Sequence, residues 1–392
     1  MLFIFQMMNN IYSCGENAIT SLGFTVEENT EQIKKDITGV GLVQDKSLFP
    51  EDFYASLIST QRLENEFSAL ANPDEYTRFE KLLILSAQNA LKQNPRIDTS
   101  SNKTVFVIST TKGNIDLLEE KQKGRFEPDR IFMWKSAQLV AQFFGNKNKP
   151  VVVSNACISG VLAISAAREM LKAGYYDNAV VIGGDIASEF VVSGFQSFKS
   201  LSFGPCKPFD LNRDGLNLGE GAGTVILTNK LENLNDHTPV LVLAGACNND
   251  ANHISGPSRT GEGLFLAVTR TMKQSGIQAH EIDFISAHGT ATSFNDEMES
   301  KAFSSAGLSN VPLNSLKGFF GHTLGAAGII ESAISIQGMR QDILFNTLGY
   351  KDYGVPEKIT IVNKLTHKVQ KNILKTASGF GGCNAAIIFS KQ

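Results

Sequence analysis

Short runs of apolar residues alternate along this chain with longer stretches in which apolar residues recur at helical spacing. Residues 105–108, 151–153 and 179–182 have the length and composition of buried strands. Between the last two, residues 161–173 carry apolar side chains at helical spacing and stop before Gly174, as a helix would. The alternation predicts an α/β protein, with a mainly parallel sheet covered by helices on both faces.

The same order of elements occurs twice. The strand at 105–108 and the small-residue turn after it correspond to the strand at 282–285 and its turn, and each follows a helical stretch. A further strand and a long helix come next in both places. Plain alternation of strands and helices also produces such echoes by chance, but the matching order favours a duplicated unit. We predict two similar halves, residues 1–235 and residues 236–392.

The composition limits the partners that the chain can have. With 392 residues, 42% of them hydrophobic, it can bury one large core or two fused cores. Its formal net charge of -3 gives no general attraction to nucleic acid or to an anionic membrane. The apolar residues 1–8 are too short for a signal peptide and lack its basic start, so we expect a first strand or a leader there. No stretch reaches the roughly 18 apolar residues of a membrane-spanning helix, which predicts a soluble protein.

Five cysteines lie far apart, without a Cys-x-x-Cys pair or a paired histidine spacing: Cys14, Cys157, Cys206, Cys247 and Cys383. This spacing argues against a zinc site and against a disulfide framework. We therefore expect reduced thiols in a cytoplasmic protein that holds no metal.

Cys157 is the cysteine with a reactive context. It lies between the strand at 151–153 and the start of the helix predicted after it. The unpaired N–H groups and the dipole at a helix start stabilise an anion, which favours a nucleophilic thiolate. Taken alone, a cysteine beside an apolar strand is more often an inert core residue. The interpretation therefore depends on other residues of the chain.

Two histidines and a lysine in the second half supply that context. His288 follows the strand at 282–285 in a His-Gly-Thr-Ala-Thr turn, and His322 precedes a run of glycine and alanine residues. Each alone also fits a structural role, in a capped turn or a tightly packed helix. Lys317, among small residues before His322, would be partly buried and needs a charge partner or a functional reason, and Glu331 is the candidate partner.

From about residue 75 to the C-terminus, these segments resemble the β-ketoacyl synthases of the chain-elongating type. Five markers occur in the family's order: Ala156 to Gly160; Pro208 to Asp210 with Arg213 to Gly215 and Gly219 to Gly223; His288 to Thr292 with Asp296 and Glu299; Lys317 to Gly328 with Glu331; and Gly379 to Gly382. The resemblance implies a thiolase-like fold with five layers, α-β-α-β-α. It also implies a homodimer and a catalytic site of one cysteine and two histidines.

The family's reaction is a decarboxylating Claisen condensation of an acyl thioester with malonyl-acyl carrier protein, in fatty acid, polyketide or aryl-polyene-type biosynthesis. By resemblance, Cys157 takes the acyl group, and the backbone N–H groups of Cys157 and Phe380 form the oxyanion hole. His288 and His322 stabilise the enolate that remains when the malonyl thioester loses carbon dioxide. The phosphopantetheine arrives on the substrate, so no cofactor belongs to the chain itself.

Further roles follow from the same resemblance. Lys317 with Glu331 fixes the protonation and orientation of the histidines, and Thr290 and Thr292 hold the pantetheine arm. Lys199 aligns with a basic residue near the family's pocket mouth and would contact the acyl carrier protein. A solvated lysine after an aromatic turn is an equally good interpretation of Lys199.

Two departures concern docking and the first half. Residues 41–74 match the family poorly, which leaves open a changed cap or dimer edge. Asp74 and Glu75 stand where relatives often carry basic residues for docking an acidic carrier protein.

A third departure concerns the acyl gate. Ser378 stands two residues before Phe380, where relatives commonly have a second Phe. Phe380 is expected to plug the acyl pocket, and Ser378 to make its glycine-rich loop easier to move. A neighbouring ring such as Phe195 or Phe203 is the alternative filler of that space.

Three rival interpretations fit less well. A thiolase has its second catalytic cysteine in a Cys-x-Gly turn, whereas Cys383 is followed by Asn384 and Ala385. Initiating ketosynthases use one histidine and one asparagine, and this chain has histidine at both positions. A non-catalytic, chain-length-determining subunit of a heterodimer typically lacks the nucleophile, and Cys157 is present. This last alternative, and a heterodimeric assembly, stay open.

Overall fold

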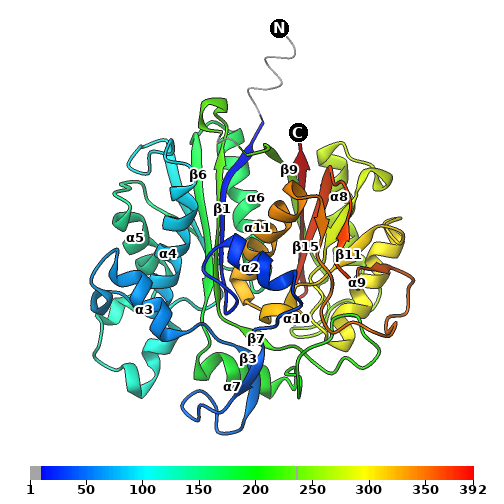
Figure 1. The fold of residues 1–392 in the computed structure, drawn as a ribbon, viewed down its shortest axis with the longest axis horizontal. Helices are drawn as coiled ribbons and strands as arrows, with labels where there is room; N and C mark the ends of the chain where they lie inside the picture. Colours follow the sequence, from blue (N-terminus) through cyan, green and yellow to red (C-terminus); the bar gives the residue numbers. More distant parts are fainter. Residues whose placement is uncertain (1–9, 235–236) are drawn as a thin grey trace.

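The computed structural model describes residues 10–234 and 237–392, and within them eleven strands form one continuous sheet (Figure 1). From the middle outwards, the strands of the first half are β1 (Tyr12–Ile19), β8 (Gly221–Thr228), β6 (Asn178–Asp185), β4 (Thr104–Ser109) and β5 (Val151–Val153). Those of the second half are β9 (Val240–Asn249), β16 (Cys383–Lys391), β15 (Asn372–Gly379), β10 (Phe284–Ser286), β11 (Pro312–Asn314) and β13 (Thr360–Ile361). The halves meet where β1 pairs with β9, at Tyr12 with Leu241 and at Ser13 with Val240.

The two halves repeat one topology. Counted along the chain, and leaving aside the edge strand β13, each half arranges its five strands in the order first, fifth, fourth, second, third. The predicted duplication is therefore confirmed. The predicted boundary between residues 235 and 236 lies outside the described residues, as does the strand or leader expected at residues 1–8.

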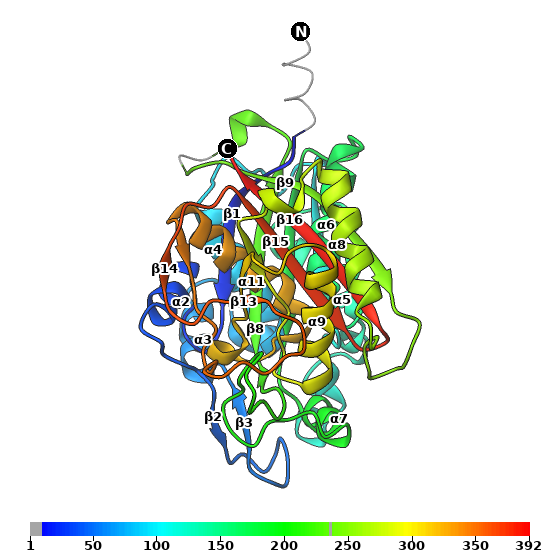
Figure 2. The same ribbon diagram turned by 90° about the vertical axis from the view of Figure 1, so that its right-hand side faces the viewer.

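Helices form three layers around the strands (Figures 1 and 2). The outer helices α4 (Arg78–Lys92) and α5 (Met133–Phe143) pack on the first half, and α8 (Glu262–Ser275) and α9 (Ser293–Ser305) pack on the second. Between the halves lie α6 (Ser159–Lys172) and α11 (Ala327–Arg340), which contact strands of both. Their side chains fill the largest apolar cluster, with contributions from the strands of both halves. The five-layer arrangement expected from the sequence is present.

The elements predicted from the apolar pattern are confirmed with small shifts at their ends. The strands expected at 105–108, 151–153 and 179–182 are β4, β5 and β6, and the helix expected at 161–173 is α6. The strand expected at 282–285 is β10, which begins two residues later because Ile282 and Asp283 follow a short 3-10 turn. Such differences of one or two residues are normal at the ends of elements.

The two central helices touch backbone to backbone at a pair of glycines. A Cβ atom on Gly160 would lie 2.8 Å from the Ile329 nitrogen, and one on Gly328 would lie 2.6 Å from the Val161 nitrogen. No side chain fits between the helices at this crossing, so their first turns come as close as two helices can. The residues just before each helix are thereby brought to the same place.

The poorly matching stretch at 41–74 is folded onto the rest of the molecule. It contains β2 (Gly41–Val43), β3 (Phe53–Ser56) and α3 (Thr60–Ser68). β3 pairs with β7 (Leu218–Gly219), and the Gly219 N–H donates to the His322 carbonyl at 3.0 Å. The remaining α-helices and strands are α2 (Val26–Ile33), α7 (Glu189–Ser197), α10 (Lys317–Phe320), β12 (Ile343–Leu344) and β14 (Thr366–His367). Among the helices of the described residues, none has the length and apolarity needed to cross a membrane.

Candidate active site

Cys157 lies in a strained turn between β5 and α6. Ala156 has a φ of 43°, in the left-handed region that residues with a side chain rarely adopt. The Ser159 hydroxyl braces the turn, since it accepts from the Asn155 N–H at 2.7 Å and donates to the Ala156 carbonyl at 2.6 Å. The thiol is therefore held at the start of α6, as predicted.

Both predicted histidines lie beside this cysteine. His288 follows β10, and His322 lies in the loop between α10 and the 3-10 turn before α11. Their ring centroids are 5.0 Å apart with the planes nearly perpendicular, at 82°. The Cys157 sulfur and one ring nitrogen of each histidine all lie within 4.8 Å of one another, and all three residues are buried. The structure thus brings together the three residues predicted from the sequence, although Cys157 lies more than a hundred positions before either histidine.

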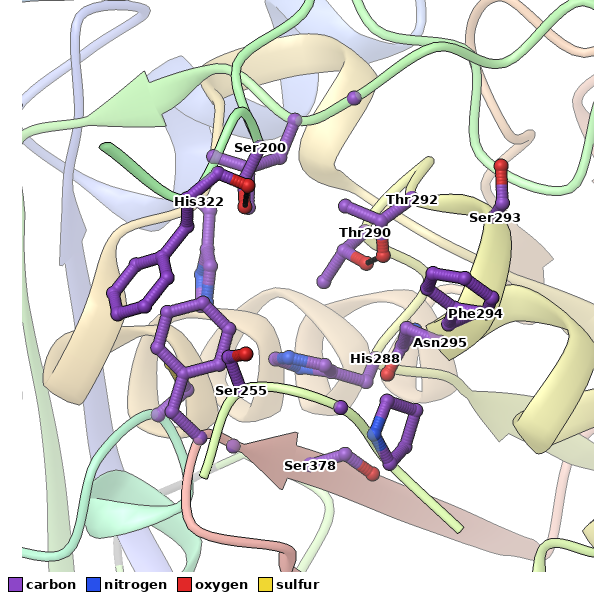
Figure 3. Close-up of a pocket in the computed structure, with 18 of the residues that line it drawn as sticks. Ser200, Ser255, His288, Thr290, Thr292, Ser293, Phe294, Asn295, His322 and Ser378 are labelled. Carbon is purple, nitrogen blue, oxygen red and sulfur yellow. Dashed lines mark hydrogen bonds between the residues drawn. The ribbon is translucent and has the colours of Figure 1, made fainter. Parts of the chain in front are cut away.

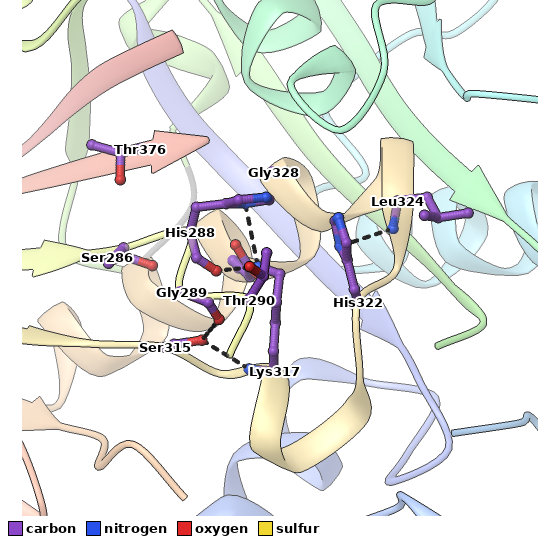
Figure 4. A network of polar contacts seen from close by, with 12 residues as sticks. Ser286, His288, Gly289, Thr290, Ser315, Lys317, His322, Leu324, Gly328 and Thr376 are labelled. Carbon is purple, nitrogen blue, oxygen red and sulfur yellow. Dashed lines mark hydrogen bonds and ion pairs between the residues drawn. The ribbon is translucent and has the colours of Figure 1, made fainter. Parts of the chain in front are cut away.

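Hydrogen bonds fix which nitrogen of each ring carries the proton (Figure 4). The Leu324 N–H donates to Nδ1 of His322 at 3.3 Å, and the Lys317 ammonium lies 3.4 Å from Nδ1 of His288. An ammonium and an N–H can only donate, so both Nδ1 atoms accept. Each neutral ring therefore carries its proton on Nε2 and offers an N–H donor there.

Both rings are neutral. Burial, reinforced by the positive charge of Lys317, holds the pKa of His288 well below its ordinary value, and the same two causes act on the pKa of His322. Lys375 lowers both pKa values further. At neutral pH the pair therefore consists of uncharged donors.

The predicted ion pair of Lys317 with Glu331 is confirmed, and the lysine is fully buried where partial burial was expected. Lys317 Nζ lies 2.7 Å from Glu331 Oε1, and it also donates to the His288 carbonyl. Lys375, which the sequence analysis missed, binds the other oxygen of Glu331 and is also fully buried. A lysine inside the apolar strand at 372–379 is the signal that could have identified it, by the argument already used for Lys317.

Two carboxylates on α9 hold the backbone around His288. Glu299 accepts from the N–H groups of His288, at 2.8 Å, and Gly289, at 2.6 Å, while Asp296 accepts from the Thr290 N–H at 3.0 Å. Burial raises the pKa of Glu299 to about 7. Asp296 and Glu299 are part of the His288 to Thr292 marker of the family resemblance, but the sequence did not indicate what they do in the site.

The expectation of a resting thiolate is wrong. Burial raises the pKa of the Cys157 thiol to about 12, and the lowering effect of Lys317 does not offset it. For a buried thiol, the desolvation of the charged form outweighs the stabilisation by a nearby positive charge. Cys157 is therefore a neutral thiol near neutral pH.

A cavity of about 410 Å³ opens from this group to the surface (Figure 3). The predicted residues that line it are Cys157, Lys199, His288, Thr290, Thr292, His322 and Phe380, together with Ser378. The hydroxyls of Thr290 and Thr292 lie 2.8 Å from each other on one wall. Lys199 is exposed at the surface end, whereas Asp74 and Glu75 do not line this cavity.

Two aromatic rings from α7 and its C-terminal end hold Phe380. The Phe195 ring stacks on it with centroids 5.5 Å apart, and the Phe198 ring meets it edge-on at 5.2 Å. Of the two rings named as alternative fillers of the space beside Ser378, Phe195 contacts Phe380, whereas Phe203 is 89% exposed. Ser378 is buried, and its hydroxyl donates to Asn384 at 2.7 Å. The sequence did not indicate the contact with Phe198.

Cys383 lies against the same loop. Its Sγ donates to the Phe380 carbonyl at 3.2 Å, and burial raises the pKa of its thiol. This arrangement gives Cys383 a structural contact in the loop.

Cysteine and histidine are also metal-ligating residues, and these three could approach one ion. Two buried lysines beside them oppose a second cation at this place. That the chain holds no metal stays a prediction.

Comparisons with known proteins agree with the geometry. Residues 8–233 match the family model "Beta-ketoacyl synthase, N-terminal domain", and residues 240–351 match "Beta-ketoacyl synthase, C-terminal domain". A putative mitochondrial 3-oxoacyl-[acyl-carrier-protein] synthase of Schizosaccharomyces pombe is 28% identical, over 98% of this chain and 99% of that protein.

Two solved structures resemble the whole chain. One is a ketosynthase in complex with its chain length factor from Xenorhabdus doucetiae, with a TM-score of 0.84, 22% identity and 98% of each chain covered. The other is a type II polyketide synthase acyl-carrier protein in complex with its ketosynthase bound to the hexaketide, with a TM-score of 0.82, 21% identity, and 98% of this chain and 99% of that one covered. The predicted thiolase-like fold is confirmed.

Proposed function

This chain belongs to the β-ketoacyl synthase family of condensing enzymes, and we propose that it extends an acyl chain by decarboxylating condensation with malonyl-acyl carrier protein. The observation that carries the proposal is the group formed by the Cys157 thiol and two neutral histidines at the end of an open cavity. One nucleophile and two N–H donors are what this reaction needs.

In the first step, Cys157 takes the acyl group. Its sulfur attacks the thioester carbonyl, the bond to the carrier sulfur breaks, and the thiol proton leaves with the carrier thiol. The backbone N–H groups of Cys157 and Phe380 stabilise the oxyanion. The Cα of Gly379, just before Phe380, lies against the Cys157 nitrogen, since a Cβ there would be 3.0 Å from it. The loop that carries the Phe380 N–H therefore lies next to the Cys157 N–H, as two donors to one oxyanion require.

In the second step, the malonyl thioester loses carbon dioxide and its thioester oxygen takes the negative charge of an enolate. The Nε2–H donors of His288 and His322 bind this oxygen. Lys317 and Glu331 keep His288 in the tautomer that donates. The enolate carbon then attacks the acyl carbonyl on Cys157, and the sulfur leaves and regains a proton from water. The product is a carrier-bound β-ketoacyl thioester.

The cavity wall supplies the contacts for the substrate's arm. Thr290 and Thr292 hold the pantetheine through their paired hydroxyls, and the chain needs no cofactor of its own. The acyl carrier protein docks at the surface end of the cavity, where Lys199 is exposed. A dimer with a second copy of the chain is the proposed assembly, and a heterodimer of the kind seen in the ketosynthase complex with its chain length factor is the alternative.

The proposal is tested by incubating the purified protein with malonyl-carrier and a panel of alkyl and aryl acyl-carriers. We expect an acyl mass on Cys157 and a product longer by two carbons, with the panel identifying the preferred primer. A protein that gains no acyl mass and releases no carbon dioxide would instead be a non-catalytic subunit.

Replacing Lys199 by Glu should raise the apparent KM for carrier-bound substrates about fivefold at low salt, because an acidic carrier meets a reversed charge at the cavity mouth. Small thioester mimics should react as before. Lys273→Glu on the outer helix α8 is the matched control, and it should leave the apparent KM unchanged for carrier-bound substrates and for small thioester mimics. Equal losses with carrier-bound and small substrates would contradict the docking role.

Replacing Ser378 by Phe should slow acylation of Cys157 by bulky primers more than by short ones. The new ring fills cavity space beside Phe380, and burying it stabilises the closed loop by about 1.5–3 kcal/mol. Phe195→Ala, which removes the ring stacked on Phe380, should shift selectivity the other way. Acylation rates across chain lengths measure both effects, and unchanged selectivity in both variants would place the gate elsewhere.

A further inference from the structure

Lys375 is an unusual residue for its position, because an ammonium inside a sheet normally costs several kcal/mol unless it is fully paired. It lies in the middle of β15 and is 0% exposed. Its nearest neighbours along the strand are apolar or small, so nothing in the strand itself accounts for a charge there.

The ammonium of Lys375 contacts the backbone just before His288 and the carboxylate that pairs with Lys317. Lys375 Nζ donates to the Ser286 carbonyl at 3.1 Å and to the Ala287 carbonyl at 3.2 Å, and it binds Oε2 of Glu331. Lys317 binds Oε1 of the same carboxylate and donates to the carbonyl of the next residue, His288. Three consecutive carbonyls, those of residues 286, 287 and 288, are thus held by two ammoniums that share one carboxylate.

The arrangement also gives the group a net charge. Within the Lys317–Glu331–Lys375 group, two lysines share one glutamate, which leaves one net positive charge in that group. Glu299 is the next carboxyl group: its pKa is raised to about 7, and it interacts with Lys375. At such sites a fixed charge is only weakly screened by solvent. A positive charge there favours an enolate forming at the histidines and disfavours a proton on either ring.

We propose that Lys375 is a positioning residue for the condensation, because its ammonium anchors the turn that carries His288 and supplies the net positive charge beside the histidine pair. The inference rests on the proposed function and extends it to a residue outside the cysteine, the two histidines and the Lys317–Glu331 pair. Lys375 does not line the cavity and acts through His288.

The pH dependence gives this role a distinctive readout. Protonating Nδ1 of either histidine would remove the acceptor that the Leu324 N–H or Lys317 uses, so activity should be lost on the acid side. Lys375 helps to hold the pKa of both histidines low, so removing it raises those pKa values. The acid limb of the pH–rate profile, the pH range over which activity is lost on acidification, therefore moves to higher pH. Other titratable groups around the pair are Cys157, Asp185, Asp296, Glu299, Lys317 and Glu331. Glu299 interacts electrostatically with Lys375 and should move in the same direction.

The test compares malonyl decarboxylation in the wild-type protein with that in Lys375→Met, across pH. We expect a rate about tenfold lower at neutral pH and an acid limb displaced upward on the order of one pH unit. Alkylation of Cys157 by iodoacetamide should change little, because Lys375 does not touch the thiol. Lys81→Met on α4, which removes another lysine that is nearly buried and paired with a glutamate, is the control and should keep the wild-type limb.

A second variant separates charge from contacts. Lys375→Met combined with Glu331→Gln restores one net positive charge, so its acid limb should return toward the wild-type position even though its rate stays low. A limb that remains displaced in this double variant would overturn the charge role. If Lys375→Met does not fold, Lys375→Arg takes its place: it keeps the charge and should keep the limb, and a displaced limb there would overturn the inference.

If Lys375→Met has the wild-type rate and the wild-type acid limb, that result would also overturn the positioning role of Lys375. Failure of the wild-type protein to decarboxylate malonyl thioester would count against the proposed function and not against Lys375 alone.

Discussion

We expect that replacing Cys157 by serine abolishes acyl transfer and condensation. A hydroxyl is a far weaker acid than a thiol and a poorer nucleophile, and in this buried turn even the thiol is held neutral by its raised pKa. The two histidines cannot act as bases for the hydroxyl, because their remaining nitrogens already accept hydrogen bonds. Serine therefore has no route to activation.

Intact-mass analysis after incubation with acyl-carrier measures this directly. The wild-type protein should gain one acyl group, located on Cys157 by peptide mapping, and the serine variant should gain none. Cys247→Ser is the control, since that thiol is exposed on β9 and lies outside the cavity. A serine variant that condenses at a rate near that of the wild type would show that the nucleophile is misassigned.

Replacing either histidine by alanine should lower malonyl decarboxylation by about 100-fold or more while leaving acylation of Cys157 measurable. Each ring contributes one Nε2–H donor to the enolate oxygen, and the loss of one donor in a preorganised site has an effect of this size. The acylation step uses backbone donors instead, so the two half-reactions should separate.

Release of labelled carbon dioxide from malonyl thioester measures the first half-reaction, and acyl mass on Cys157 measures the second. His280→Ala, an exposed histidine outside the cavity, is the control. Normal carbon dioxide release in His288→Ala or His322→Ala would remove that histidine from the site.

Much of the fold could be predicted from the chain because its strands are buried on both faces. Such strands appear as continuous apolar runs, and β4 and β6 were identified from those runs alone. β5 is a half-buried edge strand, and its three valines gave the same signal. The duplication was visible for the same reason, since equivalent strands in the two halves carry equivalent runs. The boundary between the halves has no such signal.

The candidate site was predicted unevenly. Cys157, His288, His322 and Lys317 each stand in a motif with a recognisable sequence. Lys375 and Phe198 do not, because their roles depend on which segments the fold brings alongside them: Lys375 on the turn after β10, and Phe198 on the loop after β15. The state of the thiol was mispredicted for a related reason, since a helix start is visible in a sequence and the depth of burial is not.

The close crossing of α6 and α11 at Gly160 and Gly328 ties the chemistry to the last stages of folding. The nucleophile precedes one helix and a histidine precedes the other, so the group forms only when two segments far apart in sequence have docked. Contacts of such high sequence separation form slowly, after local structure. A chain with only one half folded would hold the correct secondary structure and no reactive centre. The nucleophile and its histidines therefore share one structural condition, the docking of the two halves at this crossing.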